Sequence, residues 1–331
     1  MSRVFRPFHS SASDAMHAFL RYHRALGKRF ATEELALKLF DHYLATCGTP
    51  SLAAITPTLV NDFVCSRDRK VAKSHNHLVG VLRRWFDWMV VQGQLTRSPL
   101  QLRPRRETGP RSPFLFSEMQ AKNLIAAAEL LKDNNRARQR GIIYSMIYAL
   151  LYGLGLRVGE VARLCIQDVD WERRVLSIRE TKFLKNRLIP FGPKMATRLR
   201  NYVDQRQRKV GTLVTSDPLF SFGDDKSRPI NPSTISQAFH QLWPKLGLNV
   251  PPGVAAPRLH CLRHSFAVGT LLRWYRQGLD PNDRLLQLST FMGHSHPSST
   301  AVYLTITAEL RHEANLRFQR FASPLLQEVA S

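Results

Sequence analysis

The chain has 331 residues, of which 44% are hydrophobic, so it is long enough for two domains that each have a core. Its 48 Lys and Arg against 25 Asp and Glu give a formal net charge of +23, which is self-repelling unless a polyanion neutralises it. Residues 1–110 hold 17 basic and 8 acidic residues, so the excess is spread along the chain and is not a basic tail. The composition therefore favours nucleic acid as the partner.

Cysteine usage and hydropathy argue against secretion and membrane insertion. No Cys-x-x-Cys pair occurs among the four cysteines, which are Cys47, Cys65, Cys165 and Cys261. Without a secretory signal, they are typical of free thiols in a reducing compartment. The most apolar run, residues 141–156, is short for a membrane span and is interrupted by polar and glycine residues. We therefore predict a cytoplasmic protein without a membrane partner.

The first hundred residues show helical periodicity. Two stretches have apolar residues at helical spacing: Phe19, Tyr22, Leu26 and Phe30, then Leu35, Leu39, Phe40 and Tyr43 before a stop at Gly48. Thr56 and Pro57 predict the cap and first position of a third helix. A fourth helix is predicted from about Ser74 to Val91, with a stripe of Leu78, Leu82, Trp85, Phe86 and Met89. These patterns predict a helical bundle, and its positive charge favours a DNA-binding role.

Residues 98–113 have the composition of a linker. Four prolines stand there among four arginines, and proline removes a backbone donor and restricts the chain. The arginines are suited to run along phosphates. We expect a helical DNA-binding domain at 1–102, a Pro/Arg-rich linker at 103–113 and a second domain at 114–331.

The second region mixes helices with short strands. Residues 169–171 and 175–178 predict a hairpin, and residues 187–190 predict a third strand. Helical patterns cover residues 117–131, 136–152, 158–164, 194–209, 233–246, 262–277, 284–291 and 308–321. The expected fold class is mainly α with a small antiparallel β-sheet.

Five short elements of the second region carry candidate chemistry. In chain order they are Arg157-Val158-Gly159-Glu160, Lys182 between two strands, His260-Cys261-Leu262-Arg263, Gly293-His294 and Tyr303. Each alone favours an ordinary structural role: an ion pair, a solvated turn, a helix start, a helix end and a packed tyrosine. Their order is the informative feature.

In this order the elements resemble the tyrosine recombinases of the phage integrase family. Three boxes carry the resemblance, namely Tyr152–Val161, Leu259–Ala267 and Met292–Tyr303, and the match covers about the last 215 residues. It implies a helical core-binding (SAM-like) domain followed by a tyrosine-recombinase catalytic domain. It also implies a site-specific recombinase that cleaves and rejoins DNA through a 3′-phosphotyrosine, for integration, excision or resolution of a mobile element. The implied partners are double-stranded DNA with inverted-repeat sites and, on that DNA, a homotetramer.

Phosphoryl transfer explains why two arginines are needed. Attack on a phosphodiester gathers charge on the two non-bridging oxygens, so catalysis is mostly positioning and electrostatic stabilisation. Arg157 and Arg263 each present a planar fork of donors that stays charged. His294 would donate a further bond to the same oxygens.

The remaining candidates supply nucleophile, base and acid. Tyr303 is the expected nucleophile, and His260 is the candidate base toward its hydroxyl. The resemblance assigns the acid for the departing 5′-oxygen to Lys182, with Lys185 as the competitor. Glu160 is a supporting residue. No metal or other cofactor is required by this chemistry.

Two features depart from the compact members of the family. The interval from His260 to His294 is long, and residues 273–283 supply the excess, which resembles transposon-encoded members more than Xer-like ones. Tyr275 is a second tyrosine near this segment. Because it precedes Gly293-His294 within a predicted helix, a packing role is favoured for it.

The C-terminal residues form a further amphipathic stretch. Leu310, Ala314, Leu316 and Phe318 recur at near-helical spacing. The pattern somewhat favours packing of this stripe on its own domain, and docking in a neighbouring protomer is the functional alternative.

Three other functions stay open from the sequence. A type IB topoisomerase shares this chemistry, and a non-enzymatic DNA-binding protein could share the fold, although the complete candidate set argues against the latter. A metal-dependent nuclease or DDE-type transposase would need clustered carboxylates. Asp168, Asp170 and Glu172 are better explained as polar positions of the predicted hairpin.

Overall fold

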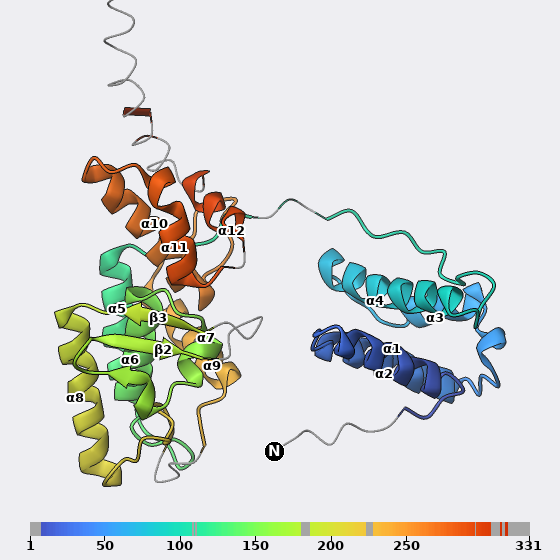
Figure 1. The fold of residues 1–331 in the computed structure, drawn as a ribbon, viewed down its shortest axis with the longest axis horizontal. Helices are drawn as coiled ribbons and strands as arrows, with labels where there is room; N and C mark the ends of the chain where they lie inside the picture. Colours follow the sequence, from blue (N-terminus) through green and yellow to red (C-terminus); the bar gives the residue numbers. More distant parts are fainter. Residues whose placement is uncertain are drawn as a thin grey trace, which may run out of the picture. The chain divides into compact units, whose positions relative to one another are not determined.

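The computed structural model describes residues 8–305, with gaps at 108, 110, 180–185, 223–227 and 295, and also residues 312, 315 and 316. The chain divides into two compact units, Met1–Pro110 and Arg111–Ser331 (Figure 1). Within the described residues, no helix is both long and apolar enough to cross a membrane. All four cysteines are free, as predicted.

The first unit is helical and has one aromatic-rich core. Its helices are α1 (Ser13–Ala25), α2 (Ala31–Thr46), α3 (Pro57–Cys65) and α4 (Ala72–Val91), with a 3₁₀ turn η1 (Leu52–Ala54) between α2 and α3. The hydroxyl of Thr56 accepts a hydrogen bond from the backbone N–H of Leu59 at 3.2 Å, with Pro57 in the first helical position. The predicted α4 stripe is fully buried. These two helices confirm the sequence prediction.

The first predicted stripe was wrong in its middle, where Tyr22 is 50% exposed, whereas Phe19 is fully buried and Phe30 packs against the core. Helix α1 ends at Ala25, because Gly27 takes a left-handed φ of 75° and the Lys28 N–H turns back to the carbonyl of His23. Leu26 is therefore 57% exposed.

The stripe predicted for α2 had the wrong phase. Leu37, Phe40 and Leu44 are fully buried, whereas Leu35 and Leu39 are exposed. The reason is tertiary, since α2 packs mainly against α4 and turns a different side toward it.

The second unit contains a three-stranded antiparallel sheet in the order β1-β2-β3. Its strands are β1 (Val169–Asp170), β2 (Val175–Ile178) and β3 (Arg187–Pro190). Leu176 pairs with Val169 on one side and Ile189 on the other, and Leu176 and Ile189 are fully buried. The three predicted strands are confirmed.

Helices form most of the second unit (Figure 1). They are α5 (Glu118–Glu129), α6 (Arg140–Gly153), α7 (Val158–Ala162), α8 (Pro193–Val210), α9 (Pro232–Leu242), α10 (His260–Arg276), α11 (Pro281–Met292) and α12 (Ser298–Ala301), with 3₁₀ turns η2 (Ile166–Asp168), η3 (Trp243–Leu246) and η4 (Val302–Thr305). The predicted class, mainly α with a small antiparallel sheet, is confirmed. The helix predicted from residue 136 begins only at Arg140, because Gln139 has a left-handed φ of 59°. Most of the helix predicted at 308–321 lies outside the described residues.

Two cores organise the second unit. The larger core lies around α6, which is buried on nearly all sides. A smaller core joins α10, α11 and η4 through Leu271, Leu288, Met292 and Tyr303. The smaller core places the tyrosine against the start of α10.

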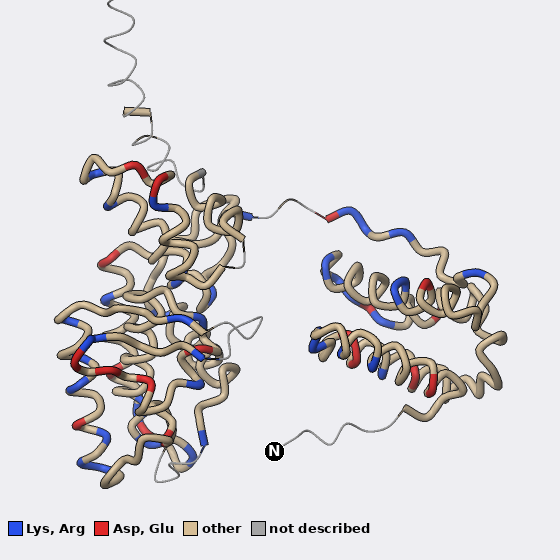
Figure 2. The backbone as a smooth tube through the Cα atoms, in the orientation of Figure 1, with Lys and Arg blue, Asp and Glu red and all other residues tan. Residues whose placement is uncertain are grey.

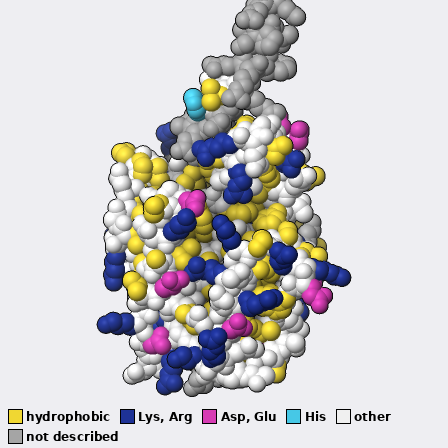
Figure 3. Space-filling view, turned by 90° about the vertical axis from the view of Figure 1, so that its left-hand side faces the viewer, with side chains coloured by type: hydrophobic (Ala, Val, Ile, Leu, Met, Phe, Trp, Pro, Cys, Tyr) yellow, Lys and Arg dark blue, Asp and Glu magenta, His cyan; other side chains and the backbone are white. Residues whose placement is uncertain are grey.

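Basic residues are distributed over both units (Figure 2). On the face of the second unit drawn in Figure 3, Lys and Arg side chains are scattered with acidic side chains between them. The positive charge is thus not gathered into one patch on that face.

Candidate active site

Arg157 and Glu160 lie at the start of α7. The backbone N–H and Nη1 of Arg157 donate to the Glu160 carboxylate at 2.9 and 2.8 Å, and Nη2 donates to the carbonyl of Gly293 at 2.7 Å. The Glu160 side chain is only 2% exposed. The ion pair of Arg157 with Glu160 therefore involves a buried carboxylate. Through the bond of Arg157 to Gly293, it connects α7 to the end of α11.

Arg187, which the sequence analysis did not assign to the site, completes this cluster. Its Nη1 and Nη2 donate to the two carboxylate oxygens of Glu160 at 2.9 and 2.8 Å, and its Nε donates to the carbonyl of Phe291 at 2.9 Å. The period of two along β3 was the available signal, since Arg187 shares a strand face with the buried Ile189. Burial alone would raise the pKa of Glu160, but the hydrogen bonds and charges of Arg187 and Arg157 outweigh it and lower that pKa to about 2.

Arg263 is almost completely buried in the first turn of α10. Its Nη1 and Nη2 each donate at 2.5 Å, to the carbonyls of Gly155 and Met292. Within the described residues its Nε has no partner. Burial and the positive charge of Arg157 lower the pKa of Arg263 to about 9, so it stays charged at neutral pH. Two fixed cations with unused donors create a site that favours an anion.

A tight turn brings the two arginines together. Gly155 has a left-handed φ of 59°, and a Cβ at that position would run into the ring of Phe266. The turn exposes the Gly155 carbonyl to Arg263 and places Arg157, two residues later, directly before the first residue of α7. Only glycine satisfies both the backbone angle and the space.

Tyr303 lies in η4 with 4% of its surface exposed. Its hydroxyl is hydrogen bonded to Nδ1 of His264 at 2.8 Å. Burial raises the pKa of Tyr303, although the charges of Arg263 and Arg157 act in the opposite direction. His264 was not among the predicted site residues, although it follows directly after the His260-to-Arg263 motif and is one helical turn from His260. That spacing was the available signal.

His294 and His260 occupy different positions relative to Tyr303. His294 Nδ1 is hydrogen bonded to the buried Thr300 hydroxyl at 2.6 Å, and its ring stacks beside Tyr303 with centroids 6.3 Å apart. Burial and the charge of Arg263 lower the pKa of His294 to about 4. His260 is exposed at the start of α10 and meets the ring of His264 edge-on, with centroids 4.6 Å apart.

The structure thus brings Arg157, Glu160, Arg263, His294 and Tyr303 together, with His260 behind His264. Lys182 and Lys185 lie outside the described residues. Tyr275 is partly buried against the smaller core on α10, in line with the packing role predicted for it.

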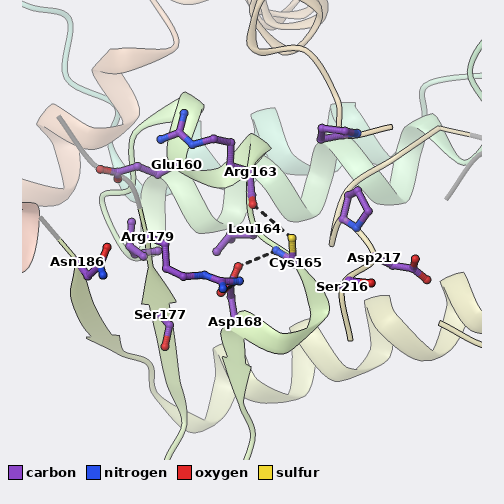
Figure 4. A pocket seen from close by; sticks show the side chains of 13 residues that line it. Glu160, Arg163, Leu164, Cys165, Asp168, Ser177, Arg179, Asn186, Ser216 and Asp217 are labelled. Atoms are coloured by element: carbon purple, nitrogen blue, oxygen red, sulfur yellow. Dashed lines mark hydrogen bonds and ion pairs between the residues drawn. The ribbon is translucent and has the colours of Figure 1, made fainter. Parts of the chain in front are cut away.

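A cavity of about 690 Å³ lies beside Glu160 (Figure 4). It is lined by residues from α7 to η2, by the end of β2 and by residues 216–218. Arg179 and Asn186, the described residues nearest to the 180–185 segment on either side, both line it. The segment that carries Lys182 therefore leaves and re-enters the described fold at the same cavity as Glu160.

Two acidic residues of the predicted hairpin, Asp168 and Asp170, have structural partners. Asp168 accepts from the Cys165 backbone N–H at 2.9 Å and pairs with Arg179 at 2.5 Å. Asp170 accepts from the Arg173 backbone N–H at 2.9 Å. No group of three or more His, Cys, Asp or Glu side chains suited to a metal ion occurs in the described part of the chain. The interpretation of these carboxylates as hairpin polar positions is supported.

Comparison with known proteins identifies the family. The phage integrase family matches residues 115–309, more than half of the chain. The chain belongs to this family, that of the tyrosine recombinases. Enzymes of the family cleave and rejoin DNA at specific sites.

Individual relatives agree with this assignment. The chain is 31% identical to the integrase/recombinase y4rB of Sinorhizobium fredii (strain NBRC 101917 / NGR234), over 94% of this chain and 98% of the relative. It is 30% identical to the tyrosine recombinase XerA of Pyrococcus furiosus, over 73% of each chain. Among solved structures, the Tn1549 transposon integrase in complex with transposon right end DNA superposes with a TM-score of 0.62 and covers 93% of this chain and 98% of that one. At 17% identity this likeness concerns the fold.

Proposed function

We propose that this recombinase cuts and rejoins double-stranded DNA at the inverted-repeat sites of a mobile element, through a 3′-phosphotyrosine on Tyr303. One observation carries the proposal: the buried Tyr303 side chain is within electrostatic range of two guanidiniums, those of Arg157 and Arg263, that backbone carbonyls already hold in place. Donors fixed before the reaction stabilise developing charge without reorganising. The tyrosine oxygen attacks phosphorus, and the energy of the broken bond is kept in the new ester so that a 5′-hydroxyl can reverse the step.

Arg157 and Arg263 hold the non-bridging oxygens in this proposal, and His294 adds a donor. The hydrogen bond of His294 Nδ1 to Thr300 supports that role, because it leaves Nε2 to face the phosphate. Glu160 acts through Arg157, whose guanidinium it orients.

Lys182 is the acid that protonates the departing 5′-oxygen. The flanking residues Arg179 and Asn186 support this assignment, since they line the cavity next to Glu160. With Lys182 as acid and a histidine as base, each proton in the reaction has a protein group to carry it, so the proposed steps use no metal or other cofactor.

DNA binding involves both units, and the active assembly is a homotetramer. The net charge of +23, spread over the chain, supports a contact that runs along phosphates. The helical first unit and its basic linker bind the duplex together with the second unit. Solved relatives were captured on DNA, among them the XerH recombinase bound to its palindromic difH substrate.

The experiment begins by finding the DNA. Tyr303→Phe protein, which keeps every proposed DNA contact, selects binding sites from a random pool of duplexes. A nicked version of the selected site is then incubated with wild-type protein, Tyr303→Phe and Tyr275→Phe. On a denaturing gel, we expect a covalent adduct with wild type and Tyr275→Phe and none with Tyr303→Phe.

Other outcomes identify the rival functions. An adduct with Tyr303→Phe but not with Tyr275→Phe moves the nucleophile to Tyr275. Cleavage that EDTA abolishes indicates a metal-dependent nuclease. Relaxation of supercoiled DNA that lacks the selected site indicates a type IB topoisomerase.

A further inference from the structure

Residues 102–107, called the linker strip below, return alongside α4 (Figure 1). Nη2 of Arg83 donates to the carbonyl of Leu102 at 2.6 Å, and Nδ2 of Asn76 donates to the carbonyl of Arg105 at 2.8 Å. Asn76 and Arg83 are two helical turns apart, which is about 10 Å along the axis of α4. Three residues of an extended chain also cover about 10 Å. The linker strip is therefore extended and runs antiparallel to α4.

Asn76 pairs with the backbone of Arg105 through both ends of its side-chain amide. Its Oδ1 accepts from the Arg105 backbone N–H at 2.7 Å, while its Nδ2 donates to the Arg105 carbonyl. The amide thus makes the two hydrogen bonds that a residue of a paired β-strand would make. Nδ2 also donates to the Glu107 carboxylate at 2.9 Å. One side chain therefore fixes both the direction and the register of the linker strip.

Packing and a further hydrogen bond hold the same segment. Leu100 and Leu102 pack against the core of the first unit. Nη1 of Arg105 donates to the carbonyl of Arg69 at 3.0 Å. Pro104 restricts its own backbone and that of the residue before it, which favours the extended form. The linker strip is therefore an ordered part of the first unit and not a free tether.

The linker strip carries exposed cations beside the start of α4. Arg103 and Arg106 are exposed on the strip, and Lys70 and Lys73 are exposed where α4 begins. The Arg105 side chain ends next to that start, through its bond to the preceding loop. Cations held at fixed places along an extended segment match the regular spacing of phosphates along a DNA strand.

We infer that the linker strip is a preformed phosphate-binding surface of the first unit, and that Asn76 is the positioning residue that orders it before DNA binds. A flexible basic segment loses conformational entropy when it becomes ordered on DNA, and a segment that is ordered beforehand avoids that cost. This inference rests on the proposed function in one respect, namely that DNA is the ligand.

The first test needs no DNA. In protein labelled with ¹⁵N-arginine, the backbone N–H of Arg105 is assigned by its loss in Arg105→Lys. We expect this N–H to exchange with solvent about tenfold or more slowly in wild type than in Asn76→Ala, because the variant removes its acceptor. Asn76→Asp keeps an oxygen acceptor and should retain part of the protection. Equal exchange rates in wild type and Asn76→Ala would overturn the inference, whether or not the protein recombines DNA.

The second test measures DNA binding in the Tyr303→Phe protein, on any duplex that this protein binds. Asn76→Ala should raise Kd about tenfold, the effect of restoring disorder to a few residues. The slope of log K against log[salt] should stay the same, since the same cations reach the same phosphates. Arg103→Gln combined with Arg106→Gln should instead make the slope shallower by about 1.8, because two phosphate contacts are lost.

Two results of this test contradict the inference. An unchanged Kd for Asn76→Ala would show that order in the linker strip does not assist binding. An unchanged slope for the double arginine variant would show that the linker strip does not contact phosphates. Combining Asn76→Ala with the two arginine substitutions should cost less affinity than the sum of the separate effects. Additive effects would mean that Asn76 acts elsewhere, which also overturns its positioning role.

Asn61→Ala is the matched control. It makes the same chemical change on α3, where Oδ1 of Asn61 has no hydrogen-bond partner among the described residues, and it should bind like the parent protein. Circular dichroism checks that each variant keeps its helices, and Asn76→Asp serves if Asn76→Ala does not fold. If wild type forms no covalent adduct on any selected DNA, the proposed function fails, whereas the Arg105 exchange rate and the binding constants still decide this inference.

Discussion

Both terminal nitrogens of Arg187 donate to the Glu160 carboxylate, at 2.9 and 2.8 Å. Because Glu160 also holds Arg157, and Arg187 also holds the carbonyl of Phe291, one carboxylate links α7, β3 and α11. These elements carry or adjoin the first arginine, the lysine segment and His294. The link explains how three separate motifs are held in one arrangement before DNA binds.

Arg187→Lys should weaken this link. A lysine keeps the charge but cannot place two parallel donors on Glu160 and a third on Phe291. We expect a loss of about 1–3 kcal/mol in the free energy of unfolding, measured with urea, because buried acceptors are left unpaired. Arg198→Lys, whose pair with Glu129 is exposed, is the control and should change by less than about 1 kcal/mol. Equal effects of the two variants would contradict the special role of Arg187.

Stability should fall as the pH drops below about 6.5. His264 and His294 have pKa values lowered to about 4 in the folded protein, mainly by burial, against 6.5 for the ordinary side chain. Both lowered values favour the neutral ring, so the stabilisation is complete above pH 6.5 and is lost as the pH falls toward 4. Each histidine contributes a slope of about 1.4 kcal/mol per pH unit in that window.

Urea unfolding between pH 4.5 and 7.5 measures this slope. His294→Gln should reduce the slope by about 1.4 kcal/mol per pH unit, which corresponds to the uptake of one proton. The free energy of unfolding should not change with pH above pH 7. Glu160 does not contribute to this window, because its pKa of about 2 places its loss of charge below pH 4.5. Identical slopes for wild type and His294→Gln would show that His294 is not held neutral.

Lys182→Ala should slow cleavage severely, whereas Lys185→Ala should slow it modestly through a lost phosphate contact. The departing 5′-oxygen needs a proton, but a 5′-bridging sulfur does not. A substrate with that sulfur should therefore restore cleavage by Lys182→Ala in a single-turnover assay. Restoration of Lys185→Ala instead would exchange the two roles.

DNA binding should depend steeply on salt. If about six to ten phosphates are neutralised by the two units and the linker, log K against log[salt] should have a slope of roughly −5 to −9. Titration of the selected site with Tyr303→Phe protein gives this slope without cleavage. A slope of roughly −2 would mean that few of the basic residues contact DNA.

Truncation after Ala308 should leave a folded, DNA-binding protein that assembles poorly and recombines little. The removed residues lie almost wholly outside those the structure describes, and the expectation rests on their amphipathic pattern. Native electrophoresis of the DNA complexes and a recombination assay measure the two effects. Full-length rates and tetrameric complexes from the truncated protein would mean that the segment does not couple protomers.

The sequence alone determined the elements whose signals are local. The Thr56-Pro57 start of α3, the α4 stripe and the three strands follow from caps and periodicities within a few residues. The ordered motifs identified the family, because residue type and order along the chain carry that information without coordinates. The chain also showed that two arginines, two histidines and a tyrosine were available for phosphoryl transfer.

Tertiary structure decided which of these groups touch. Arg187 reaches Glu160 across 27 positions, Tyr303 reaches His264 across 39, and Arg157 reaches Gly293 across 136. A periodicity records which residues share a face, but not which partner that face meets, and for this reason α2 buries Leu37 rather than Leu35. Which of the two histidines one turn apart on α10, His260 or His264, is hydrogen bonded to Tyr303 depends on where η4 packs along α10. The smaller core as a whole sets that position.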